Sequence, residues 1–223
     1  MRRFVLWSLV LLLPLMVSCS PSPRAAVARG CADAEAACLQ GKATVLMNTS
    51  RGEITIEVDG DAAPLTAGNF VDLVRRGTYD GTMFHRVVRE PVPFVVQGGD
   101  PQSSDRSVPL SQLGTGSFVD PDNGVARMIP LELSFQGEDA PRYSRVSSNP
   151  SELQDLVLTH ERGAVAMARS QAPDSASAQF YIALRPLPEL DGRYAVFGRV
   201  VKGLELVDTI EQGDRIQTAR LSD

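Results

Sequence analysis

The sequence predicts a mainly β fold: a closed or strongly curved antiparallel sheet whose ends are covered by two helices. Short β-rich runs recur along most of the chain and are separated by turn residues. Only two stretches have the spacing of an amphipathic helix. The 223 residues, 43% of them hydrophobic and 22% charged, suit one globular domain with an extension.

The first half of the domain begins with a predicted hairpin in residues 43–58, where KATVLMNT and GEITIEV flank a turn at SRG. A helix follows, with Thr66 as its N-cap and Gly77 at its end. The apolar face of this helix is formed by Phe70, Leu73 and Val74. Two strands are expected at TMFHRVV and FVVQ. Residues 98–161 are polar and contain Pro and Gly, and a stretch this long is usually functional or an excursion with some structure of its own.

The second half contains three further strands, GAVAMARS, QFYIALR and YAVFGRVV. The second predicted helix is KGLELVDTIEQG, because Leu204, Val207 and Ile210 have helical spacing and glycines bracket the segment. RIQTARL closes the chain as a last strand. Many short strands with two helices are the pattern that predicts the fold class.

The first residues have the pattern of an export signal. Arg2 and Arg3 precede an apolar run in residues 4–17, which is too short and too quickly ended for a membrane span. The sequence LMVSC resembles a bacterial lipobox, in which the cysteine is lipidated and becomes the first residue of the mature chain. We therefore expect residues 1–18 to be a lipoprotein-type signal peptide and Cys19 to be the lipidation site; a plain secretory signal and an uncleaved anchor stay open.

Residues 19–42 are predicted to be a linker or tether, because SPSPRAAVARG is rich in Pro, Ser and Ala. A lipid on Cys19 would hold the domain at a membrane of the cell envelope, on the periplasmic side. The alternative is a soluble secreted or periplasmic protein. Nothing in the sequence argues against a monomer.

The charge of the chain argues against nucleic acid as a partner. The net charge is −5, and it becomes −7 when residues 1–18 are removed with their two arginines. The sequence has no block of Lys and Arg, so we expect no nucleic-acid binding and little affinity for anionic lipid.

The cysteines and histidines exclude several chemistries. Cys19, Cys31 and Cys38 all precede residue 39, so the predicted domain has no thiol nucleophile and no cysteine metal site. On a helix, Cys31 and Cys38 would lie about 10 Å apart, beyond disulfide reach. A disulfide between them would require a loop, and the sequence leaves both states open.

Covalent, metal and phosphoryl-transfer catalysis all lack their usual motifs. His85 and His160 are the only histidines, and neither has a metal-ligand spacing. No G-x-S-x-G motif is present, and LGTGS is too short for a phosphate loop. We therefore expect no metal and no other cofactor. Serines near His160 keep a hydrolase open as the least favoured hypothesis.

Rotation about an X-Pro peptide bond needs no nucleophile and no base. Its barrier is near 20 kcal/mol because twisting destroys amide resonance. In the twisted state the proline nitrogen regains a localised lone pair, to which a guanidinium can donate a hydrogen bond. Such a bond would stabilise the twisted state more than the planar one, as catalysis requires.

Six stretches, taken in order, resemble the cyclophilins, a family of peptidyl-prolyl cis-trans isomerases. They are GTMFHRVV, FVVQGGD, LGTG, GAVAMARS, SAQFYIAL and LDGRYAVFGRVVKGLELVD. The resemblance implies a closed eight-stranded antiparallel β-barrel capped by two α-helices, in residues 43–220, with an insertion at about 120–158. It implies an isomerase without cofactor that acts on Pro-containing polypeptides, here exported proteins whose folding it assists.

The resemblance also implies roles for individual residues. Arg86 matches the catalytic arginine, and Gln97 matches a glutamine that orients it and binds the substrate backbone. The residues matched to substrate binding are Phe94, Val95, Ala168, Arg169, Gln179, Tyr181, Leu190 and Tyr194. Tyr181 stands where phenylalanine is usual, so its hydroxyl needs a partner or a water. His85 is expected to be structural, because strand alternation points it away from the face of Arg86.

Three departures from the family pattern bear on function. VVREPVP separates Arg86 from Phe94 and is longer than the usual connection. Glu189 stands where cyclosporin-sensitive members have tryptophan, so weak binding of that drug is expected. The insertion at about 120–158 could lie beside the groove. A binding module without useful turnover is therefore the alternative to an active isomerase.

Overall fold

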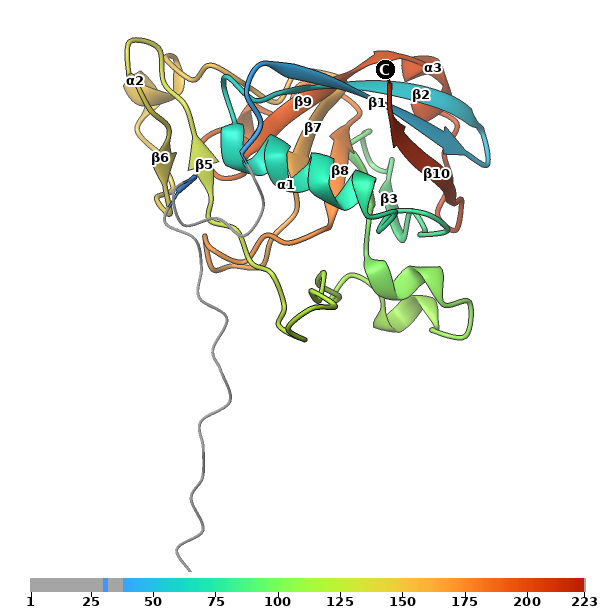
Figure 1. Ribbon diagram of the computed structural model, residues 1–223. Helices are drawn as coiled ribbons and strands as arrows, with labels where there is room; N and C mark the ends of the chain where they lie inside the picture. The colour runs from blue at the N-terminus through green and yellow to red at the C-terminus, as the bar shows by residue number, and fades with distance from the viewer. Residues whose placement is uncertain (1–29, 32–37, 223) are drawn as a thin grey trace, which may run out of the picture.

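The computed structural model describes residues 30–31 and 38–222 (Figure 1). The strands are β1 (Lys42–Thr49), β2 (Gly52–Asp59), β3 (Arg86–Val88), β4 (Val95–Gly98), β5 (Glu132–Leu133), β6 (Arg142–Tyr143), β7 (Ala164–Met167), β8 (Phe180–Ala183), β9 (Val196–Lys202) and β10 (Ile216–Leu221). The helices are α1 (Pro64–Arg75), α2 (Pro150–Leu153) and α3 (Leu204–Val207), with 3-10 turns η1 (Pro101–Ser104), η2 (Leu110–Gln112) and η3 (Pro188–Leu190). The expected signal peptide and Cys19 lie outside the described residues.

Eight strands form one antiparallel, strongly curled sheet in the order β10-β1-β2-β9-β7-β8-β4-β3 (Figure 1). The mainly β fold is therefore confirmed. Closure into a complete barrel is not: in the described part of the chain, the edge strands β3 and β10 share no ladder. The segments that precede them meet at one bridge, Met83 to Arg215, and at backbone hydrogen bonds between Phe84 and residues 213–214.

The interior of the curled sheet is a single apolar core, and the predicted hairpin supplies one side of it. β1 and β2 pair along their whole length, and their alternate residues are buried. Phe70, Leu73 and Val74 of α1 join the same core, as predicted for its apolar face. Side chains of α1 and of the strands thus pack together on the inner face of the sheet, which leaves its other face outside this core.

The start of α1 differs from the prediction. The helix begins at Pro64 with Ala63 as its N-cap, so Thr66 lies in the first turn and the prediction for Thr66 was wrong. The carboxylate of Glu132 instead accepts hydrogen bonds from the N–H groups of Leu65 (3.0 Å) and Thr66 (2.7 Å). Glu132 is only 2% exposed, and this burial raises its pKa. A distant side chain has replaced the local cap, because a buried helix end needs an acceptor for its free N–H groups.

The second predicted helix is a single turn. α3 ends at Val207, and the segment that follows it turns without further helix. Arg89 donates hydrogen bonds to the carbonyls of Val207 (3.1 Å) and Ile210 (2.8 Å), so a side chain takes the place of a further helical turn. The prediction for the end of α1 agrees better with the structure, because Gly77 follows the helix with a positive φ of 69°.

The expected insertion at about 120–158 has structure of its own. β5, β6 and α2 lie together at one end of α1 (Figure 1). This segment forms a small separate core of Leu131, Leu133, Phe135, Leu153 and Leu156 with Ala195. The excursion predicted from its length is therefore a packed one, which extends the domain beside the start of α1.

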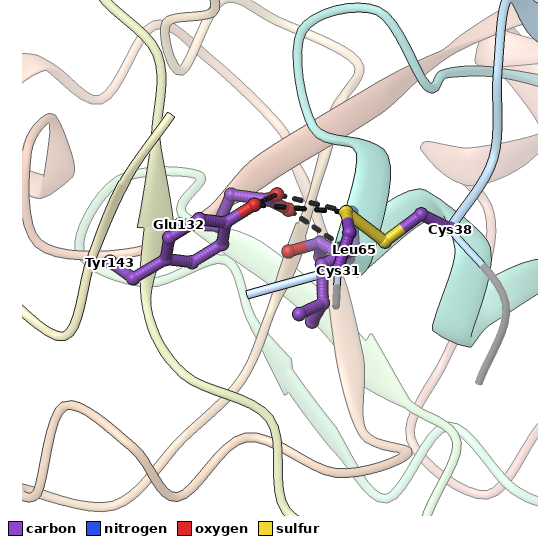
Figure 2. Close-up of a disulfide and its surroundings, with 6 residues drawn as sticks. Cys31, Cys38, Leu65, Glu132 and Tyr143 are labelled. Carbon is purple, nitrogen blue, oxygen red and sulfur yellow. Dashed lines mark hydrogen bonds between the residues drawn. A yellow bond between two sulfur atoms is a disulfide. The ribbon is translucent and has the colours of Figure 1, made fainter. Parts of the chain in front are cut away.

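A disulfide joins Cys31 and Cys38, which settles the alternative that the sequence left open. Figure 2 shows it beside Tyr143, Glu132 and the first turn of α1. The Cys31 sulfur lies 3.9 Å from the Tyr143 hydroxyl, which hydrogen-bonds to Glu132 at 2.9 Å. Leu39 also donates its N–H to the Pro64 carbonyl. No helix in residues 30–31 and 38–222 has the length and apolar content needed to cross a membrane.

Candidate active site

The register of three neighbouring strands brings Arg86, Gln97 and Tyr181 into one row. Arg86 of β3 pairs with Gln97 of β4, which in turn pairs with Tyr181 of β8. Directly opposed residues in an antiparallel pair project from the same face of the sheet. The three side chains therefore lie side by side on the outer face, away from the main core.

The polar side chains of this row form a hydrogen-bonded chain. Arg86 donates to the amide oxygen of Gln97 at 3.4 Å, and the Gln97 amide nitrogen donates to Gln179 at 3.2 Å. Gln179 then donates to the Gly116 carbonyl at 2.8 Å. Within the described residues no carboxylate forms an ion pair with Arg86, which is exposed. The guanidinium is thus oriented by an amide and keeps its charge available.

A second apolar cluster lies on the same outer face, separate from the main core. Its buried members include Val95 and Tyr181, together with Ala164, Ala166, Ala183, Leu187 and Val196. Phe94, Ala168, Leu190 and Tyr194 are half-buried and pack against them. All six apolar or aromatic residues assigned to substrate binding from the sequence therefore belong to one cluster. It adjoins the row of Arg86 through Tyr181.

The hydroxyl of Tyr181 has the partner that the sequence analysis required. It lies 2.7 Å from Nε2 of His160, whose Nδ1 lies 2.7 Å from Asp191. Both ring nitrogens of His160 are therefore engaged, and neither bond involves a serine. This removes the arrangement on which the hydrolase hypothesis depended. The contact of Asp191 with His160 could not be predicted from the sequence, because no spacing rule links residues 160, 181 and 191.

The family model described as cyclophilin type peptidyl-prolyl cis-trans isomerase matches residues 44–223. The chain belongs to the cyclophilin family. A Brucella abortus protein named as a probable peptidyl-prolyl cis-trans isomerase is 32% identical over 176 residues, which cover 78% of this chain and 74% of the relative. A Synechocystis protein named as a thylakoid lumen peptidyl-prolyl cis-trans isomerase is 39% identical over 193 residues, and the match covers 82% of this chain and 48% of the relative. The chain thus spans about half of that relative.

A solved cyclophilin of Cryptosporidium parvum has the same fold, with a TM-score of 0.60 at 23% identity over 82% of this chain and 98% of that one. A second structure of that protein, solved in the presence of the dipeptide Ala-Pro, gives a TM-score of 0.59 at 24% identity over 81% of this chain and 99% of that one. The family predicted from the sequence is therefore confirmed.

In this cyclophilin, Arg169 binds residues at the edge of the apolar cluster. Its guanidinium lies over the Tyr194 ring, 4.8 Å from the ring centroid. It donates to the carbonyls of Arg193, Ser170 and Gln171. The Arg169 side chain therefore holds two loops and Tyr194 together, a role that the sequence did not suggest.

A hollow of about 380 Å³ adjoins the row on the side of Gln97 and Gln179. Asp100, which is fully buried, accepts the N–H groups of Gly114 (2.6 Å) and Gly116 (3.2 Å) and so shapes its wall. A Cβ at Gly116 would lie 2.0 Å from a carboxylate oxygen of Asp100, so only glycine fits there. Met128, from the insertion, also lines the hollow, so the insertion does reach the site.

His85 is 6% exposed, and neither of its ring nitrogens has a hydrogen-bond partner among the described residues. Burial is the main cause that lowers its pKa, so the ring is neutral at neutral pH. Its neighbour Arg86 is exposed, as strand alternation predicted.

The long connection after Arg86 is fixed at both ends. The Phe94 N–H donates to the Val88 carbonyl, and Arg89 binds the end of α3 as described above. Arg185 donates to the Pro93 carbonyl and forms an ion pair with Glu189 at 2.7 Å. These bonds hold residues 89–93 onto neighbouring elements.

We expect Gln97→Ala to lower kcat/KM for X-Pro isomerisation by about tenfold, because Arg86 loses the acceptor that orients it but keeps its charge. A peptide-based isomerisation assay measures the change. Gln112→Ala, an exposed glutamine on η2, is the matched control. An unchanged kcat/KM in Gln97→Ala would show that the Arg86–Gln97 bond does not orient the guanidinium.

Proposed function

We propose that this cyclophilin accelerates cis-trans rotation of X-Pro bonds, with Arg86 as the group that stabilises the twisted amide. The observation that carries the proposal is the single outer face on which Arg86 and Gln97 adjoin the apolar cluster around Tyr181. The apolar cluster can bind a proline ring, and the guanidinium of Arg86 beside it can donate a hydrogen bond to the proline nitrogen. The chemistry needs no base, nucleophile or metal.

Each predicted residue has a place in this mechanism. The residues that would hold the proline ring all belong to the apolar cluster; they are Phe94, Val95, Tyr181, Leu190 and Tyr194. Twisting localises the lone pair on the proline nitrogen, to which Arg86 donates. Gln97 would fix the Arg86 guanidinium and contact the peptide backbone. Ala168, Arg169 and Gln179 border the adjoining hollow, where the chain that precedes proline would lie.

The cellular setting is part of the proposal. Uncatalysed isomerisation takes about 10–100 s, long enough to limit folding, so an exported isomerase would assist exported Pro-containing polypeptides. The name of the Synechocystis relative places that protein in a lumen, which supports an exported compartment. We infer a signal peptide in residues 1–18, lipidation at Cys19, a tether to residue 42 and an isomerase domain in residues 43–220. The anchored domain would act as a monomer on the periplasmic side.

The test is a refolding assay in which an unfolded protein with a slow proline-limited phase regains its fluorescence. We expect the purified chain to accelerate that phase at catalytic concentrations. Peptide binding without acceleration would contradict the proposal and favour a binding module that presents Pro-containing partners.

A further inference from the structure

A buried polar chain lies beneath the apolar cluster that would hold proline. It runs from Asp191 through His160 to the hydroxyl of Tyr181, with 2.7 Å between the atoms at each step. The His160 side chain is fully buried, and the side chain of Asp191 is 13% exposed. Tyr181 itself is 4% exposed and packs edge-on against Tyr194. Three residues from separate parts of the chain thus meet under one wall of the site.

The hydrogen-bond partners determine which way each proton points. The Asp191 oxygen that faces Nδ1 of His160 also accepts the backbone N–H of His160 at 2.8 Å, so it is an acceptor. Nδ1 therefore carries a proton, which leaves Nε2 as the acceptor when the ring is neutral. Burial raises the pKa of Tyr181 well above its ordinary value, so its hydroxyl stays protonated and donates to Nε2.

The backbone of His160 also binds the neighbouring loop. The His160 carbonyl accepts the N–H of Leu187 at 2.8 Å, and Leu190 donates its N–H to Leu187. Leu190, one wall of the cluster, directly precedes Asp191. His160 is therefore bonded to Tyr181 on one side and to the loop of Leu190 on the other.

We propose that His160 and Asp191 are positioning residues of the proline pocket, which hold Tyr181 as its floor and Leu190 as its wall. The proposal rests on the proposed function. A tyrosine can serve as an apolar floor only if its hydroxyl is satisfied beneath the surface. Without His160, that hydroxyl would be a buried donor with no acceptor, and the ring would shift or admit water. The pocket would then bind proline less tightly.

A double-mutant cycle tests the proposal. NMR titration and exchange spectroscopy of an X-Pro peptide give its Kd and the rate of interconversion while bound. We expect His160→Leu to raise Kd about tenfold while changing the bound rate by less than about threefold. Tyr181→Phe in the His160→Leu background should recover most of the lost affinity, because a phenylalanine floor needs no acceptor.

Conservative variants separate positioning from general packing. His160→Gln offers both an acceptor for Tyr181 and a donor for Asp191, so it should bind peptide more tightly than His160→Leu. Asp191→Asn keeps the acceptor oxygen, because the backbone N–H of His160 holds it in place, whereas Asp191→Ala removes it. We therefore expect a weaker effect for Asp191→Asn than for Asp191→Ala. Far-ultraviolet circular dichroism and thermal melts identify any variant that fails to fold.

Two outcomes would overturn the inference: wild-type affinity in a folded His160→Leu, or no gain in affinity when Tyr181→Phe is added to it. If His160→Leu does not fold, the comparison of Asp191→Asn with Asp191→Ala decides, and equal affinities would count against the inference. Each of these failures would leave wild-type turnover intact. Failure of the proposed function would instead appear as absent turnover in the wild type.

Discussion

Arg86→Ala is expected to lower kcat/KM for X-Pro isomerisation by about 100- to 1000-fold, the usual loss when one transition-state donor is removed from a site. Most of the loss should fall on kcat. The nitrogen of a planar amide has no free lone pair, so the hydrogen bond from Arg86 forms only as the bond twists. A protease-coupled peptide assay at several substrate concentrations separates kcat from KM.

Two further variants show whether charge alone is sufficient. Arg86→Lys keeps the charge but loses the planar fork that Gln97 orients, so we expect it to recover little of the activity. Arg106→Ala replaces an exposed arginine on the excursion after β4 and should match the wild type. Recovery by lysine to near the wild-type rate would contradict the directional role of the guanidinium.

Glu132→Ala is expected to destabilise the fold by about 3 kcal/mol, because two buried N–H groups and one half-buried hydroxyl lose their acceptor and each unsatisfied buried group costs roughly 1–3 kcal/mol before relaxation. The donors are the N–H groups of Leu65 and Thr66 and the hydroxyl of Tyr143. For a domain of this size the melting temperature should fall by roughly 6–12 °C. Glu138→Ala, which breaks an exposed pair with Arg142 in the same region, is the matched control and should change little.

The pH dependence of this stability has a definite sign. Burial raises the pKa of Glu132 above its ordinary value of 4.5, so the folded state holds the proton more tightly than the unfolded state. Stability from this group is therefore greatest below pH 4.5 and falls as pH rises through the folded pKa. Glu132→Gln cannot titrate. Its side-chain amide replaces one of the two acceptor oxygens of the carboxylate with a donor. The unfolding free energy of the wild type minus that of Glu132→Gln should therefore fall as pH rises from 4.5 through the folded pKa. A difference that stays constant with pH would contradict the raised pKa.

The mainly β fold, the hairpin of β1 and β2, the body of α1 and the family could all be predicted from the sequence, because they depend on local periodicity and contiguous motifs. The resemblance also assigned Phe94, Val95, Tyr181 and Leu190 to substrate binding, and the structure finds them in one cluster. In each of these cases the pattern lies within a few neighbouring residues, or in the order of short motifs along the chain.

The features that the sequence did not reveal all depend on contacts between distant residues. The cap of α1 comes from Glu132, which is 66 residues from Thr66. α3 is short, and the carbonyls at its end bind Arg89, which is 118 residues from Val207. The bond between His160 and Tyr181 likewise joins separate elements. No spacing rule encodes such pairs. Local propensity therefore favoured Thr66 as the N-cap of α1, although Glu132 accepts the free N–H groups there.

The central claim is that Arg86 acts on the twisted amide and not on binding. Exchange NMR spectroscopy of a labelled X-Pro peptide with wild type and Arg86→Ala tests it most directly. We predict a similar Kd for both proteins, and rapid interconversion of bound cis and trans peptide only with the wild type. Interconversion at the wild-type rate on Arg86→Ala, or a loss of binding that accounts for the whole loss of turnover, would contradict the claim.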